Sequence, residues 1–129
     1  MLATINSLGV KGIGGYAVTV ESFVSNGLFN FDIVGLPDAA VKEARERVRA
    51  AIKCLAATGT IKQPGADCAF FGELALTGEL RPVNGALPMA LCAAREGIKK
   101  LFVPADNAEE AAYAEGVSVY PVKNVPELI

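Results

Sequence analysis

The chain has 129 residues, of which 52% are hydrophobic and 20% charged, which is typical of one folded domain and excludes a disordered segment. Twelve Lys and Arg residues against fourteen Asp and Glu residues give a formal net charge of −2, without the basic excess of dedicated nucleic-acid binders. Three widely spaced cysteines and no histidine leave no disulfide framework, no set of four zinc ligands and no histidine-based catalytic triad.

The first third of the chain is expected to form strands. Residues Leu2–Leu8 alternate apolar and polar side chains as a half-buried strand does, and Tyr16–Val24 is rich in β-favouring residues. A third strand is predicted at Phe29–Leu36, which ends at a glycine and a proline. Four glycines between the first two strands are expected in the turn: Gly9, Gly12, Gly14 and Gly15. They match neither phosphate-binding glycine pattern.

The clearest predicted helix is Asp38–Lys53, with Asp38 as its N-cap and apolar residues on one 3.6-residue stripe. Basic residues at steps of three and four form a second stripe, hereafter the basic stripe: Lys42, Arg45, Arg49 and Lys53. Such a stripe is most often a solvated face, here partly neutralised by Glu43 and Glu46. Two alternatives are a contact with an acidic protein surface and a contact with DNA phosphates.

The middle of the chain predicts a helix end, a hairpin and a second helix. Leu55–Gly59 is expected to end a helix at a glycine, and 60–69 is a loop. Strands Phe70–Leu76 and Glu79–Val83 would form a hairpin in which Glu73 and Glu79 could face each other. A helix over 86–96 is expected to end at Gly97. Its predicted apolar face is Leu87, Ala90, Leu91 and Ala94.

Strands and helices then alternate to the C-terminus. Leu101–Val103 and Val117–Val122 are predicted strands, with a helix at Asn107–Glu115 between them that is capped by Asn107 or Asp106. Val125–Ile129 is expected to start a last helix. This alternation predicts an α/β arrangement of layers.

Two long blocks carry a family likeness. They are FDIVGLPDAAVKEARERVRAAIK, from Phe31 to Lys53, and FFGELALTGELRPVNGALPMALCAAREGIKKLFVPADNAEEAA, from Phe70 to Ala112. With the opening MLATINSLGVKGIGGYAVTVE, they resemble the N-terminal (ChlI-type) domain of magnesium-chelatase-like AAA+ proteins of the ComM type. The resemblance implies a single domain over 1–129 with the ribosomal protein S5 domain 2-like fold, which the proteolytic domain of Lon shares. That fold is α/β (α+β), with a mixed sheet and packed helices.

The chain departs from the family pattern at one place. Between Lys53 and Leu55 the family has a further strand, a loop with a Gly-Pro element and most of a helix. A natural deletion, an engineered deletion and an omission of the segment from the recorded sequence are three explanations. We favour the omission, because loss of a strand would expose a sheet edge and remove core from a small domain.

The resemblance implies a non-catalytic accessory domain, with ATP and Mg²⁺ bound by a downstream AAA+ domain of a ring-forming protein. The full protein would be a DNA branch-migration helicase in natural transformation. Apolar runs too short to span a membrane, and an N-terminus without a signal-peptide pattern, predict a cytoplasmic protein with no membrane partner. A stand-alone nucleic-acid- or protein-binding domain is the alternative. A degenerate Lon-like peptidase is a further one, although Lon enzymes pair a serine with a lysine. The serine element falls in the missing segment, and the lysine position holds Leu87, which cannot transfer a proton.

Overall fold

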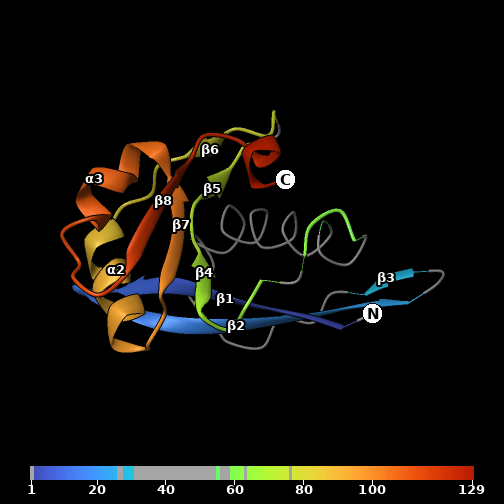
Figure 1. The fold of residues 1–129 in the computed structure, drawn as a ribbon, viewed down its shortest axis with the longest axis horizontal. Coiled ribbons are helices and arrows are strands. Elements are labelled where there is room, and N and C mark those ends of the chain that lie inside the picture. The colour runs from blue at the N-terminus through green and yellow to red at the C-terminus, as the bar shows by residue number, and fades with distance from the viewer. Residues whose placement is uncertain (1, 26–27, 31–54, 56–58, 63, 76) are drawn as a thin grey trace.

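The computed structural model describes residues 2–25, 28–30, 55, 59–62, 64–75 and 77–129 (Figure 1). The strands of its main sheet are β1 Leu2–Lys11, β2 Gly14–Ser25, β3 Leu28–Asn30, β4 Cys68–Phe70, β7 Lys100–Pro104 and β8 Ser118–Val122. They lie in the order β3-β2-β1-β4-β7-β8, with the first three antiparallel and the last three parallel to β1. The predicted α/β (α+β) class with a mixed sheet and packed helices is confirmed.

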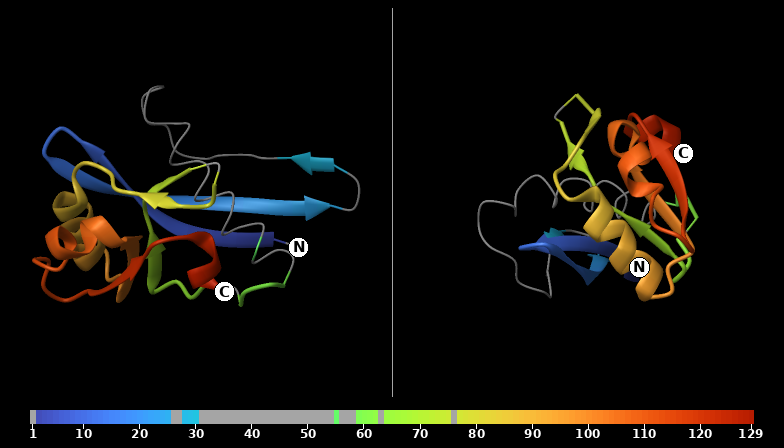
Figure 2. Two further views of the ribbon diagram at one scale, coloured as in Figure 1. Left: turned by 90° about the horizontal axis from the view of Figure 1, so that it is seen from above. Right: turned by 90° about the vertical axis from the view of Figure 1, so that its left-hand side faces the viewer.

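Strands β1 and β2 pair antiparallel as a long two-stranded ribbon, which extends along the length of the molecule (Figure 2). Both predicted strands are confirmed, but they reach further toward each other than the sequence indicated. The expectation that all four glycines lie in the turn is wrong, because Gly9 belongs to β1 and Gly15 to β2. Only Gly12, with φ of 63°, lies between the two strands.

Close packing explains the two strand glycines. A Cβ atom on Gly9 would collide with the ring of Tyr16, its partner across the ribbon. A Cβ atom on Gly15 would collide with the Pro88 carbonyl oxygen and lie 2.7 Å from Cβ of Cys92. Pro88 and Cys92 belong to helix α2 (Ala86–Arg95), so the glycine lets this helix lie directly on the ribbon.

Helix α2 is confirmed, but its predicted apolar face is wrong by about one residue of rotation. The buried residues of the helix are Ala86, Met89, Ala90, Cys92 and Ala93. Leu91 is instead 52% exposed, and Leu87 and Ala94 are half-buried. Apart from Met89, small side chains face inward, because the helix approaches the ribbon at Gly15 too closely for a row of leucines.

The predicted hairpin forms with much shorter strands, β5 (Glu73–Leu74) and β6 (Leu80–Arg81). Its register places Glu73 opposite Arg81, so the expected meeting of Glu73 and Glu79 is wrong. Glu79 instead makes an isolated bridge to Asn124. The predicted loop over 60–69 ends early because Cys68 already belongs to β4.

The C-terminal helices are shorter than expected. The segment predicted as helix Asn107–Glu115 forms a 3₁₀ turn, η1 (Ala105–Asn107), and one helical turn, α3 (Ala108–Ala111). Neither predicted cap operates, since no side-chain cap hydrogen bond is present at either element. The last predicted helix is a 3₁₀ turn, η2 (Val125–Leu128), whose Asn124 cap accepts a hydrogen bond from the Glu127 N–H at 3.2 Å.

The helix end at Gly59 is confirmed. Leu55 is helical, Gly59 has φ of 73°, and the Thr60 N–H donates to the Leu55 carbonyl oxygen at 2.9 Å. This six-to-one bond is the signature of a helix C-terminus that closes at a left-handed glycine. The strand prediction beyond Asn30 and the predicted helix Asp38–Lys53 lie outside the described residues.

The two faces of the sheet carry two buried clusters. The larger, which includes Leu8, Met89 and Leu101, lies on the face that α2 and α3 cover. The smaller consists of Ile5, Cys68 and Phe70, with partly buried neighbours, on the opposite face. Within the described ranges, no helix is long and apolar enough to cross a membrane.

Candidate functional site

An aromatic ladder crosses three neighbouring strands on the second face of the sheet. The parallel register sets Phe70 of β4 opposite Phe102 of β7, and Phe102 opposite Tyr120 of β8. The rings stack with centroid distances of 4.7 and 5.1 Å and interplanar angles of 11° and 22°. Adjacent strands lie about 4.8 Å apart, so the register alone brings the rings to stacking distance. The ladder runs from the core to an open edge, since Phe70 is 6% exposed and Tyr120 42%.

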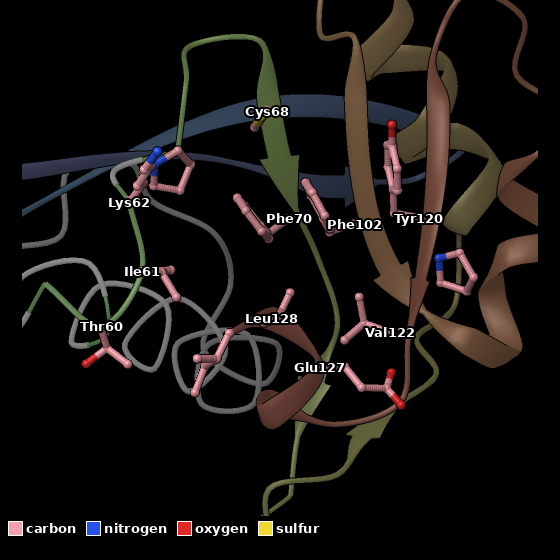
Figure 3. A pocket seen from close by; sticks show the side chains of 13 residues that line it. Thr60, Ile61, Lys62, Cys68, Phe70, Phe102, Tyr120, Val122, Glu127 and Leu128 are labelled. Atoms are coloured by element: carbon pink, nitrogen blue, oxygen red, sulfur yellow. The ribbon is translucent and has the colours of Figure 1, made fainter.

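The ladder forms the floor of a cavity of about 600 Å³, hereafter the aromatic groove (Figure 3). Ile61 and Leu128 line its sides and pack against the smaller buried cluster. Two exposed charged residues, Lys62 and Glu127, also line it. The Glu127 carboxylate accepts a hydrogen bond from the Lys123 N–H at 2.8 Å, which holds η2 beside the groove. Among the described residues, the lining of the groove is mainly apolar, and its charged members are exposed.

Cys68 lines the groove, and its surroundings make it a poor nucleophile. Burial raises the pKa of the Cys68 thiol, and the charge of Asp67 raises it further. Asp67 also accepts a hydrogen bond from the Cys68 thiol at 3.6 Å. The reactive form of cysteine is the thiolate, so these effects keep Cys68 protonated and unreactive at neutral pH.

The position at which a Lon-type lysine is expected lies at the start of α2. Leu87 occupies it, and its N–H donates to a carboxylate oxygen of Glu110 at 2.9 Å. The turn before the helix is held by Asn107, whose side-chain amide bonds both the N–H and the carbonyl oxygen of Val83, at 2.8 and 3.0 Å. Lys99 and Lys100 follow the other end of this ten-residue helix, a length of about 15 Å. Leu87 therefore leaves the family's lysine position without a proton-transfer side chain.

The glycine-rich stretch after β1 has the structure of a strand–turn–strand ribbon. A phosphate-binding glycine loop leads into a helix whose N–H groups face the phosphate. Here the stretch leads from β1 through the turn at Gly12 into β2, a strand and not a helix, so this arrangement is absent from the ribbon. Nor does the described part of the chain contain a group of three or more His, Cys, Asp or Glu side chains that could hold a metal ion.

The basic stripe, Lys42, Arg45, Arg49 and Lys53, lies outside the described residues. Its contact with DNA or with protein therefore stays a prediction. Sequence reasoning missed the aromatic groove, whose signal is one aromatic residue within each of three apolar strand segments: CAF, KLFVP and SVYPV. Only the strand order and register show that these three rings are neighbours.

Comparisons with known proteins identify the family to which the chain belongs. The family model described as "Subunit ChlI of Mg-chelatase" matches residues 20–58 and 51–107, which is more than half of the chain. An uncharacterized protein of Mycobacterium tuberculosis (strain ATCC 25618 / H37Rv) is 34% identical over 157 aligned positions, which cover 95% of this chain and 31% of that protein. Competence protein ComM of Haemophilus influenzae is 30% identical over 163 positions, which cover 99% of this chain and 32% of ComM.

A more distant likeness extends to a peptidase. Lon protease 1 of Hydrogenovibrio crunogenus is 32% identical over 99 positions, which cover 71% of this chain and 12% of that protease. The chain spans about a third of the length of the Mycobacterium and Haemophilus relatives. The ChlI match and these two relatives agree with the likeness carried by the two sequence blocks. The chain belongs to the magnesium-chelatase-like AAA+ family, of the ChlI and ComM type.

Proposed function

We propose that the chain is a non-catalytic N-terminal accessory domain of a longer magnesium-chelatase-like AAA+ ATPase. The observation that carries the proposal is the match to ComM, which covers 99% of this chain but 32% of ComM. The 129 residues contain no G-x-x-x-x-G-K-[ST] loop, so ATP and Mg²⁺ would bind in the sequence that follows. The mainly apolar described lining of the aromatic groove, and Leu87 at the family's lysine position, support a contact role over a catalytic one.

The whole protein is proposed to be a DNA branch-migration helicase that works in the cytoplasm during natural transformation. A competence protein, ComM, is among the relatives, which supports this role. The ATPase core would assemble as a ring, with this domain beside each ATPase domain. Within such a ring the domain would assist assembly or position the DNA substrate.

The basic stripe is the surface proposed to make either contact. Four positive side chains on one predicted helix face would attract DNA phosphates or an acidic face of a neighbouring subunit. The total charge of −2 means that any attraction for DNA must come from such a local patch.

Removal of the domain from the full-length protein tests the proposal. We expect the truncated protein to lose ring assembly, measured by light scattering after gel filtration, or branch migration of a synthetic four-way junction. In the full-length protein, reversal of Lys42, Arg45, Arg49 and Lys53 to Glu should weaken whichever property the stripe serves. A matched control reverses Glu43 and Glu46 to Lys on the same predicted helix. Unchanged assembly and unchanged branch migration in the truncated protein would refute an accessory role.

Two alternatives have distinct signatures. A stand-alone nucleic-acid-binding domain would bind DNA without the ATPase core, with an affinity that falls steeply as salt rises. A degenerate Lon-like peptidase, an alternative that the Lon likeness keeps open, would cleave an unfolded protein substrate such as casein. Measurable cleavage that survives Leu87→Ala would locate that activity away from the family's lysine position.

A further inference from the structure

Helix α2 carries a second apolar stripe on the side that points away from the sheet. Its inward side is formed by buried residues that include Met89 and Ala90. Leu87 and Leu91 lie on the outward side, about one helical turn apart, and Leu91 is 52% exposed. A helix that is apolar all round is typical of a helix with a partner on each side. The sheet is the inner partner, so the outward stripe is a candidate contact surface.

Two further exposed apolar side chains flank this stripe. Among the described residues five large apolar side chains are exposed, and three of them are Ile13 at 99%, Leu91 and Tyr113 at 75%. Ile13 lies at the tip of the ribbon, two residues before Gly15, which rests against α2. Tyr113 follows α3, which packs beside α2. The right-hand view of Figure 2 looks onto α2, with the ribbon on one side and α3 on the other.

These three side chains, Ile13, Leu91 and Tyr113, are hereafter the α2 face. Apolar side chains that gather on one exposed surface within a polar rim are typical of protein–protein contact sites. The rim of the α2 face therefore bears on the kind of partner that it fits.

The charges in this rim are divided between two edges. Every charged residue from Leu101 to Val122, a stretch that includes α3, is acidic and exposed: Asp106, Glu109, Glu110 and Glu115. Three of the four exposed charged residues in 95–100, at the end of α2, are basic: Arg95, Lys99 and Lys100, beside Glu96. The Arg95 guanidinium donates a hydrogen bond to the Cys92 sulfur at 3.6 Å, which holds Arg95 on the ribbon side of α2. The α2 face thus has an acidic α3 edge and a basic ribbon edge.

Hydrogen bonds set the direction of the α3 edge relative to α2. Glu110 lies at the start of α2, because its carboxylate accepts the Leu87 N–H. Ser118 lies beyond the end of α2, because its N–H donates to the Lys99 carbonyl oxygen at 2.8 Å. The chain between Glu110 and Ser118 therefore runs in the same direction as α2. Glu115, near the end of this stretch, lies toward the same end of α2 as Arg95.

We propose that the α2 face is a self-association surface, and that its partner is the same face of a second copy of this chain. A half-turn about an axis parallel to α2 sets the ribbon edge of each copy against the α3 edge of the other. Leu91 then meets its counterpart at the centre, and Ile13 of each copy meets Tyr113 of the other. Arg95 of each copy meets Glu115 of the other.

Charge complementarity favours a second copy as the partner. The surface carries both signs, so it is complementary to itself in this orientation, with opposite charges on both sides of an apolar centre. The net charge of −2 adds little repulsion between two copies. The proposal rests on the α2 face alone, and it does not depend on the helicase function or on an ATPase domain.

Sedimentation velocity of the 129-residue chain measures the association. The contact area of one helix face and its two edges is small, so the Kd of the dimer should lie between about 10 µM and about 1 mM. The sedimentation coefficient should rise from the monomer value toward the dimer value as the protein concentration passes through this range. A coefficient that stays at the monomer value up to about 1 mM would overturn the proposal.

Matched isoleucine variants locate the contact. Ile13→Glu changes a side chain of the α2 face, whereas Ile129→Glu changes a 68% exposed side chain that lines the aromatic groove. Both sites are exposed, so the circular dichroism spectrum of each variant should match that of the parent chain. We expect Ile13→Glu to weaken dimerisation at least about tenfold and Ile129→Glu to change it less than about twofold. Equal effects of the two variants would contradict the proposed surface.

Charge reversal tests the pairing of the two edges. Arg95→Glu and Glu115→Lys each set like charges opposite each other, so each should weaken dimerisation at least about fivefold. The double variant with both changes restores opposite charges across the interface and should recover the parent Kd to within about twofold. A double variant that dimerises no more tightly than either single variant would overturn the proposed pairing.

Discussion

Adjacent glycines in β2 should respond very differently to the same substitution. Gly15→Ala places a methyl group against the Pro88 carbonyl oxygen and 2.7 Å from Cβ of Cys92. Both obstacles belong to the body of α2, so relief requires the helix to move away from the ribbon. Such overpacking costs about 1–3 kcal/mol. At Gly14, the nearest atom to a new Cβ is the Lys11 carbonyl oxygen at 3.8 Å, so Gly14→Ala should change stability by less than about 1 kcal/mol.

Urea denaturation followed by circular dichroism measures the contrast. For a domain of this size, the Gly15→Ala cost corresponds to a drop in melting temperature of roughly 4 °C per kcal/mol. Gly14→Ala serves as the control because it adds the same methyl group one residue away in the same strand. Equal stability of the two variants would refute the conclusion that α2 rests on the ribbon at Gly15.

Three further predictions concern single side chains. Asn107→Ala removes two hydrogen bonds to the backbone of the turn before α2 and leaves the partly buried N–H and carbonyl of Val83 unpaired. The unfolding free energy should therefore fall by about 2–4 kcal/mol in urea titrations, and a loss below about 0.5 kcal/mol would contradict this role. Glu110→Ala removes the exposed acceptor of the Leu87 N–H and should cost about 0.5–1 kcal/mol, whereas Glu109→Ala, one residue earlier, should cost nothing measurable. Because the pKa of Cys68 is raised in the folded state, the unfolded chain loses that proton first, and stability should decline as pH rises through about 9. Cys68→Ala should weaken this decline, and an unchanged pH profile would contradict the raised pKa.

Much of the fold follows from local sequence patterns. The alternation over Leu2–Leu8, the turn signal at Gly97 and the short apolar run at Leu101–Val103 each predicted the element that forms there. These residue patterns act within a few positions of the sequence, so they can be recognised before any tertiary contact is known. The family likeness could be recognised for a different reason, because two long blocks of sequence resemble the family.

The errors arose where tertiary packing decides the outcome. The inward face of α2 is set by close approach to Gly15, which selects small residues over Leu91. Asn107 looked like a helix cap because asparagine caps helices locally, but its amide instead bonds the backbone at Val83. A partner 24 residues away cannot be identified from a cap pattern.

The candidate site was the least predictable part. Phe70, Phe102 and Tyr120 are separated by tens of residues, and each occurs within an ordinary apolar strand. They become one surface only through the order and register of β4, β7 and β8. The basic stripe differs in the opposite way. Its spacing can be recognised in the sequence, but its residues lie outside the described part of the chain.

Peptide mapping of the endogenous protein tests the central claim most directly. The protein would be captured with an antibody to this domain and digested, and its peptides would be identified by mass spectrometry. The account predicts peptides that continue past Ile129 into a G-x-x-x-x-G-K-[ST] loop of an AAA+ domain. A native product that ends at Ile129 would contradict the accessory-domain account and favour a free-standing binding protein.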